Sequence, residues 1–106
     1  MIPANILKID TLDEGWTDKD LVMLHACFQL FMDCIEKEEL HADRDWNQSD
    51  RHREAKKEID ILESWWKQRI ADDQQGKLNP IMKKDQYEQD TQMLIRLILI
   101  REFFWT

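Results

Sequence analysis

Glycine and proline are almost absent from this chain, and this scarcity constrains its fold more than any other feature. Two glycines and two prolines occur in 106 residues. Sandwiches and barrels place such residues at their many turns, and phosphate-binding loops need several glycines. The sequence therefore excludes all-β folds and glycine-rich phosphate loops, and it predicts an all-α protein with few turns.

Length and composition indicate one folded domain. A chain of 106 residues has the size of a single domain, and 42% hydrophobic residues are enough for a core. We therefore expect one helical domain over residues 1–106 and exclude a two-domain enzyme. The formal charge of -7 argues against binding to DNA or to an anionic membrane, so we expect neither partner.

Hydrophobic periodicity and breaker residues place the helices. The apolar run near the start is too short for a helix, so we expect an extended arm over residues 1–16. Three longer segments have the periodicity of amphipathic helices, and together they predict a three-helix bundle. These helices are expected over residues 18–40, 50–70 and 85–104.

Capping residues precede two of the expected helices. Thr17 followed by Asp20 resembles a capping box before the first helix. Either Ser49 or Asp50 can cap the second helix.

The first and third helices carry more apolar surface than a three-helix monomer can bury. Apolar side chains surround the hydrophobic seam of the first helix, and the stretch from Met93 to Trp105 is apolar on nearly every side. Each helix of such a bundle buries roughly one stripe. We therefore expect a homo-oligomer that assembles through these helices. The predicted interface residues are Phe28, Phe31, Arg96, Phe103, Phe104 and Trp105.

An aromatic and basic cluster is the leading candidate for ligand binding. Tryptophan rings beside basic side chains could hold a nucleotide base and its phosphates. The alternative is that these tryptophans are core residues and the charges favour the end of the second helix. The candidate binding residues are Trp46, Arg51, His52, Trp65, Trp66, Lys67 and Arg69.

Carboxylate pairs raise the alternative of a metal-dependent enzyme. Two helices that present Glu pairs inward hold magnesium in helical pyrophosphohydrolases and iron in di-iron bundles. The pairs here are Glu36-x-x-Glu39, Glu38-x-x-His41, Glu54-x-x-x-Glu58 and Asp60-x-x-Glu63. The second Glu-x-x-His of a di-iron set is absent, and lysines alternate with the acids of the second helix as on a solvated face. We expect no metal and no cofactor.

The nucleophiles of the chain lack a catalytic setting. The serines do not stand in a glycine elbow. Cys27 and Cys34 are about 10 Å apart along a helix, which is too far for a disulfide, so we expect reduced structural thiols. We therefore expect a protein that is not an enzyme. The N-terminus lacks the pattern of a signal peptide, which predicts a cytoplasmic location.

Several segments together resemble a group of small uncharacterised helical proteins encoded by tailed bacteriophages. The resemblance spans most of the chain and includes the terminal Trp105-Thr106. It implies a product made in the cytoplasm of an infected bacterium and directed at the host or its defences. The segments that carry it are residues 16–20, 28–30, 36–38, 58–59, 65–67, 93–98, 100–101 and 104–106.

Three hypotheses for the function result. The first is a non-enzymatic binding protein that inhibits or modulates a host protein or an anti-phage defence factor. The second is a sponge that sequesters a nucleotide signal between protomers. The third is a magnesium-dependent nucleotide pyrophosphohydrolase. The surplus apolar surface and the lack of a catalytic set favour the first.

Overall fold

The computed structural model of the protein is all-helical, as the sequence predicts. It describes residues 6–13, 15, 17–75 and 83–104. Its elements are α1 (Lys19–Glu36), α2 (Asp50–Gln74), α3 (Lys83–Leu99) and a final 3₁₀ turn, η2 (Arg101–Phe104). No strand occurs within these ranges.

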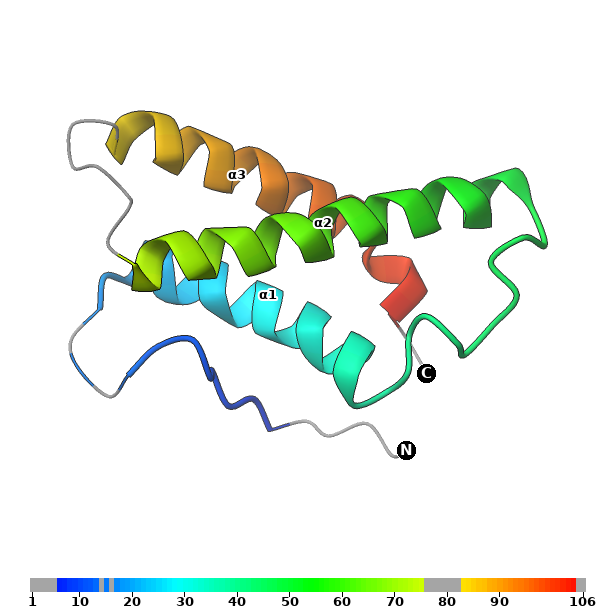
Figure 1. Cartoon of the computed structure of the whole chain (residues 1–106), viewed down its shortest axis with the longest axis horizontal. Coiled ribbons are helices and arrows are strands. Elements are labelled where there is room, and N and C mark those ends of the chain that lie inside the picture. Colours follow the sequence, from blue (N-terminus) through cyan, green and yellow to red (C-terminus); the bar gives the residue numbers. More distant parts are fainter. Residues whose placement is uncertain (1–5, 14, 16, 76–82, 105–106) are drawn as a thin grey trace.

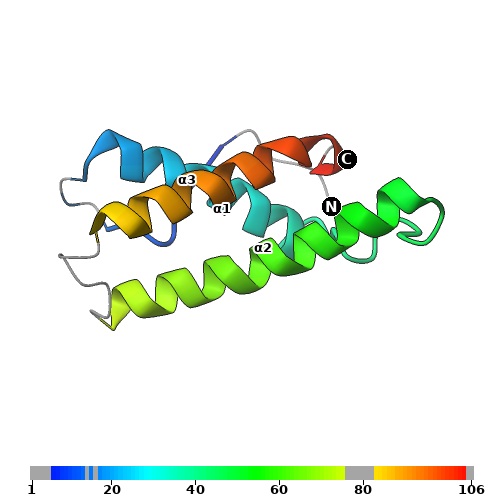
Figure 2. The same cartoon turned by 90° about the horizontal axis from the view of Figure 1, so that it is seen from above.

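The three helices form a bundle along the longest axis of a molecule that measures 45 × 28 × 21 Å. α1 and α3 run in the same direction, and the longer α2 runs opposite to both (Figure 1). Seen from above, α1 and α3 lie together on one side of α2 (Figure 2). α3 contacts both of the other helices, which closes the bundle around one core.

Apolar residues at helical spacing build this core from all three helices. Phe28 of α1 stacks on Trp66 of α2, with ring centroids 4.6 Å apart and ring planes 14° apart. Ile59 and Leu62 on the same face of α2 are fully buried. The buried stripe of α3 completes the core with Met93, Leu97 and Ile100.

The first helix is shorter than the expected 18–40, because the chain reverses after Glu36. Glu39 adopts a left-handed conformation with φ 56°, and the Leu40 N–H donates to the Cys34 carbonyl at 3.0 Å. A continuous helix would turn Leu40 about 120° away from Phe28. The reversal instead carries Leu40 into the core, where it is buried.

The capping prediction is confirmed for the second helix and wrong for the first. Ser49, one of the two predicted candidates, caps α2, since its Oγ accepts a hydrogen bond from the His52 N–H at 3.2 Å. The capping box at Thr17 is wrong: the N-cap of α1 is Asp18, whose side chain makes no capping hydrogen bond. α2 also continues past residue 70 to Gln74.

The third helix does not run through to residue 104 as expected. It ends at Leu99, and η2 follows as a tighter turn in which the Phe103 N–H donates to the Ile100 carbonyl at 3.1 Å. This turn places the Phe103 ring 5.9 Å from the Trp46 ring, measured between centroids. Phe103 is thereby buried, and it covers the end of the core.

Ion pairs fix α3 against α2 at two levels. The Arg69 guanidinium donates two hydrogen bonds to the Asp90 carboxylate, at 2.9 and 3.0 Å, and both side chains are buried. Nearer the surface, Arg96 donates to both carboxylate oxygens of Glu58. The Arg96 guanidinium lowers the pKa of the Glu58 carboxyl, against a smaller opposing effect of burial.

The segment before α1 hydrogen-bonds to that helix. Residues 6–13 contain no helix or strand. The Asp10 N–H donates to Gln29 Oε1 at 3.0 Å, and Thr11 Oγ1 lies 2.7 Å from His25 Nδ1. These contacts supply partners for Gln29 and His25, two buried polar residues of α1.

Candidate functional site

The side of α3 that faces away from the core is apolar in its C-terminal half. Three residues spaced by three and four positions lie on it, and we call them the outer α3 face: Ile95, Ile98 and Leu99. Their exposed fractions are 51%, 49% and 73%. Large apolar side chains in such a continuous group are typical of a surface that meets another molecule.

The same side of α3 becomes polar toward the start of the helix. Steps of four residues lead from Leu99 through Ile95 and Thr91 to Tyr87, which is half exposed. An open depression lies there, lined by Lys84, Tyr87, Glu88, Thr91 and Gln92. The helix therefore presents an apolar half and a polar half to its surroundings.

The aromatic residues predicted for an interface lie mainly inside the chain. Phe28, Phe31 and Phe103 are buried in the core of the single chain, so as folded here they are not available to a second copy. Phe104 is partly buried against the same core. Trp105 lies outside the described residues.

Arg96, the charged residue predicted for the interface, is partly exposed, but Glu58 holds its guanidinium. The outer α3 face was not distinguished from the buried stripe in the sequence, because apolar residues occupy both sides of this part of the helix.

The tryptophans predicted to stack on a nucleotide are mostly core residues. Trp66 is buried under Phe28, and Trp46 is buried with its Nε1–H donated to the Leu40 carbonyl at 3.1 Å. Trp65 is half-buried and packs against the core. The structural alternative considered for these rings therefore fits their positions better than the stacking surface does.

The predicted basic residues are held by acids of the chain itself. Arg69 is buried against Asp90, Lys67 pairs with Glu63 at 2.9 Å, and Arg51 pairs with Glu102.

The two predicted walls of the nucleotide site also lie far apart. His52 and Arg51 pack near Phe103 and Trp46 at the start of α2, whereas Trp66 is fourteen or more residues further along the same helix. At 1.5 Å per residue that separation is about 20 Å. The structure does not bring these groups together into one pocket.

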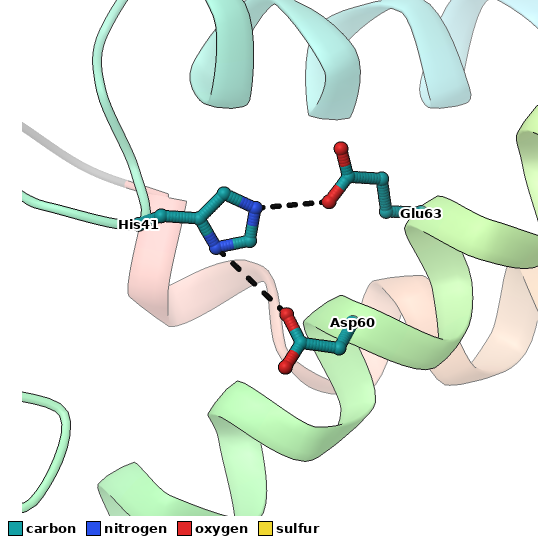
Figure 3. A group of neighbouring side chains, drawn as sticks. All are labelled: His41, Asp60 and Glu63. Carbon is teal, nitrogen blue, oxygen red and sulfur yellow. Dashed lines mark hydrogen bonds and ion pairs between the residues drawn. The ribbon is translucent and has the colours of Figure 1, made fainter.

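A cluster of residues from two of the pairs named in the sequence joins the α1–α2 connection to the middle of α2. The imidazole of His41 lies between the carboxylates of Asp60 and Glu63 (Figure 3). His41 Nε2 is 2.9 Å from Glu63 Oε1, and Nδ1 is 3.8 Å from Asp60 Oδ1. One donor atom from each of the three residues lies within 4.8 Å of the others.

The protonation of the His41 ring follows from its partners. An ionised carboxylate only accepts hydrogen bonds, so Nε2 carries the proton that it donates to Glu63. Burial raises the pKa of the Glu63 carboxyl, but hydrogen bonds from Lys67 and His41 outweigh it and the net pKa lies below the ordinary value. Nδ1 is covered by the protein and has no hydrogen-bond partner among the described residues.

Two halves of this cluster are visible in the sequence, but their meeting is not. Asp60 and Glu63 are three residues apart and therefore share a face of α2. His41 reaches that face only because α1 ends at Glu36 and the chain reverses, whereas the sequence predicts that His41 directly follows a helix end at residue 40.

The cysteines are placed as structural thiols. Burial, followed by the negative charges of Glu38 and Asp33, raises the pKa of Cys34 to about 11. Burial also raises the pKa of the half-buried Cys27. Thiols with raised pKa values are poor nucleophiles at neutral pH.

Comparisons with protein-family models, with curated proteins and with solved structures find no match for this chain. None of the helices in the described ranges is both long and apolar enough to cross a membrane.

Proposed function

We propose that this chain is a non-enzymatic binding protein whose contact surface is the outer α3 face. The observation that carries the proposal is the exposure of Ile95, Ile98 and Leu99 on the side of α3 opposite its buried stripe. Covering apolar side chains of this size contributes roughly 25 cal/mol per Å² removed from water. A second molecule seated there would gain that energy without disturbing the core.

The first partner that we propose for this surface is a second copy of the chain. Met23 and Leu30 add exposed apolar side chains on α1, so the two helices expected to mediate assembly both carry uncovered apolar surface. Apolar surface in excess of what one core can bury favours self-association. The contact residues that we propose for α3 are those of its outer face, in place of the buried phenylalanines Phe28, Phe31 and Phe103.

The second partner that we propose is a bacterial host or defence protein, which the chain would inhibit or modulate in the cytoplasm of an infected cell. This part rests on the resemblance to phage-encoded proteins and on the apolar character of the outer α3 face. The nucleotide sponge has less support, because Trp66 and Arg69 are buried within the core and an ion pair. The pyrophosphohydrolase also has less support, because Glu58 and Glu63 are held by Arg96 and Lys67.

Light scattering of two matched variants tests self-association. Ile98→Glu puts a charge on the outer α3 face, and Ile61→Glu puts the same charge at an isoleucine of α2 that is 46% exposed. We expect the wild type and Ile61→Glu to have the mass of an oligomer and Ile98→Glu to have the mass of a monomer. All three should have the same helical circular dichroism, because neither side chain belongs to the core.

A wild-type monomer at tens of micromolar would contradict the homo-oligomer. Equal dissociation by both substitutions would contradict the assignment of the contact to α3.

A further inference from the structure

We propose that His41 and Asp60 form a binding site for a first-row divalent metal ion of the Zn²⁺ type, with Glu63 positioning the imidazole. The site does not depend on the outer α3 face, and it would act by tying the α1–α2 connection to α2. The three side chains converge from two segments that are far apart in the sequence (Figure 3).

The spacing of the two proposed ligand atoms suits an intervening ion. His41 Nδ1 and Asp60 Oδ1 are 3.8 Å apart, which is too long for a hydrogen bond. Zinc bonds to nitrogen and oxygen are about 2.0–2.2 Å long, so two ligand atoms in tetrahedral geometry are about 3.4 Å apart. A shift of a few tenths of an ångström would place both atoms on one ion.

The Nδ1 atom of His41 is chemically available for this role. Its lone pair is free in the neutral tautomer, because the proton is on Nε2, where Glu63 accepts it. Nδ1 is covered by the protein although the side chain as a whole is 35% exposed, and it has no hydrogen-bond partner within the described part of the chain. A covered ring nitrogen without a partner is unfavourable, and a metal bond would satisfy it.

Glu63 has the position of the carboxylate that orients the histidine ligand in many zinc sites. A metal-bound histidine usually donates its other ring N–H to a carboxylate, which fixes the ring and makes the metal-binding nitrogen more basic. The 2.9 Å contact between His41 Nε2 and Glu63 Oε1 provides this arrangement. Glu63 is itself held by Lys67 at 2.9 Å, so its carboxylate is anchored on both sides.

The cation now beside Asp60 can be displaced at low cost. Lys56 Nζ lies 2.8 Å from Asp60 Oδ1, one helical turn away, and the Asp60 side chain is 56% exposed. Exposed ion pairs of this spacing contribute little to stability. We expect a divalent ion that also gains the covered His41 nitrogen as a ligand to displace Lys56. Water fills the remaining positions, so we expect micromolar rather than nanomolar affinity.

Thermal melting and calorimetric titration with zinc chloride test the site. We expect Zn²⁺ to raise the melting temperature of the full chain and to bind with one ion per chain, whereas Mg²⁺ at the same concentration has no effect because imidazole does not suit it. Asp60→Asn should weaken zinc binding at least tenfold. Glu63→Gln should weaken it about tenfold while leaving the ligands in place.

The control variants separate this site from other zinc ligands. Glu54→Gln removes an exposed carboxylate from the same helix and should bind zinc like the wild type. Cys27→Ser should also bind like the wild type. Circular dichroism without metal checks that Asp60→Asn folds. We expect it to fold because the Asp60 side chain is exposed.

No heat of binding and no melting shift with zinc would overturn the proposal. Binding that Asp60→Asn leaves intact, or that Cys27→Ser abolishes, would overturn it equally.

Discussion

The contact between Arg69 and Asp90 is a buried ion pair that joins α2 to α3. Two charge-assisted hydrogen bonds join α2 to α3 there, and Gln86 donates a third to Asp90 at 2.8 Å. Removing one member of such a pair leaves an uncompensated charge in the interior, which costs about 3–5 kcal/mol. Replacing both members with apolar residues removes the charge as well as the contact.

We therefore expect Arg69→Met to lower the free energy of unfolding by about 3–5 kcal/mol and the double variant Arg69→Met/Asp90→Leu to lower it by less. Urea denaturation followed by circular dichroism measures both. A double variant as unstable as the single one would show that the unpaired Asp90 charge is not the source of the loss.

The thiol of Cys34 makes a second prediction at this scale. With a pKa of about 11, set by burial and then by Glu38 and Asp33, it carries almost no thiolate at pH 8. We expect a thiol reagent to modify Cys34 only as fast as the chain unfolds. Mass spectrometry of the labelled peptides measures this rate, and rapid labelling of Cys34 in the native protein would contradict the buried position.

At the scale of elements, the end of α1 is the place where local preference and tertiary packing disagree. Residues 36–40 are all good helix formers, yet the helix stops at Glu36 and Glu39 takes a left-handed conformation. A left-handed conformation costs a residue with a side chain roughly 1–2 kcal/mol, and glycine avoids that cost. The burial of Leu40 offsets the penalty.

Glu39→Gly should therefore raise the free energy of unfolding by about 0.5–1 kcal/mol, after the greater flexibility of glycine in the unfolded chain is allowed for. Lys57→Gly, at an exposed position in the interior of α2, should lower it by about 0.5–1 kcal/mol. Chemical denaturation compares the two. A loss of stability in both variants would mean that residue 39 is not left-handed in solution.

The positions of the helices could be predicted from the sequence, but two of their ends could not. Periodicity located all three helices, and the cap of α2 could be narrowed to Ser49 or Asp50 because a capping hydrogen bond is local. The ends of α1 and α3 were not, because Leu40 and Phe103 leave the helical path to reach a core that only the folded chain defines.

The candidate sites also depend on contacts between segments that are distant in the sequence. Burial of Trp46, Trp66 and Arg69 depends on contacts between distant segments, so their residue types alone suggested a ligand site. The meeting of His41 with Asp60 likewise depends on the reversal after α1.

At the scale of the whole molecule, a single chain buries its core but leaves the outer α3 face exposed. The bundle buries one stripe from each helix, and Leu40 and Phe103 cover the end of the core beside Trp46. Ile95, Ile98 and Leu99 stay outside this arrangement although they are as apolar as the residues within it. We infer that the protein meets its partners along α3, and the His41 cluster on α2 is a separate feature.

Site-specific photo-crosslinking tests whether partners bind on the outer α3 face. A photoreactive amino acid at Leu99 lies on the outer α3 face, and the same amino acid at Ile61 provides an exposed control on α2. After irradiation in bacterial cells and in purified protein, we expect covalent adducts, including a dimer of the chain, from position 99 and not from position 61. Adducts from neither position, or equal adducts from both, would contradict a binding surface on α3.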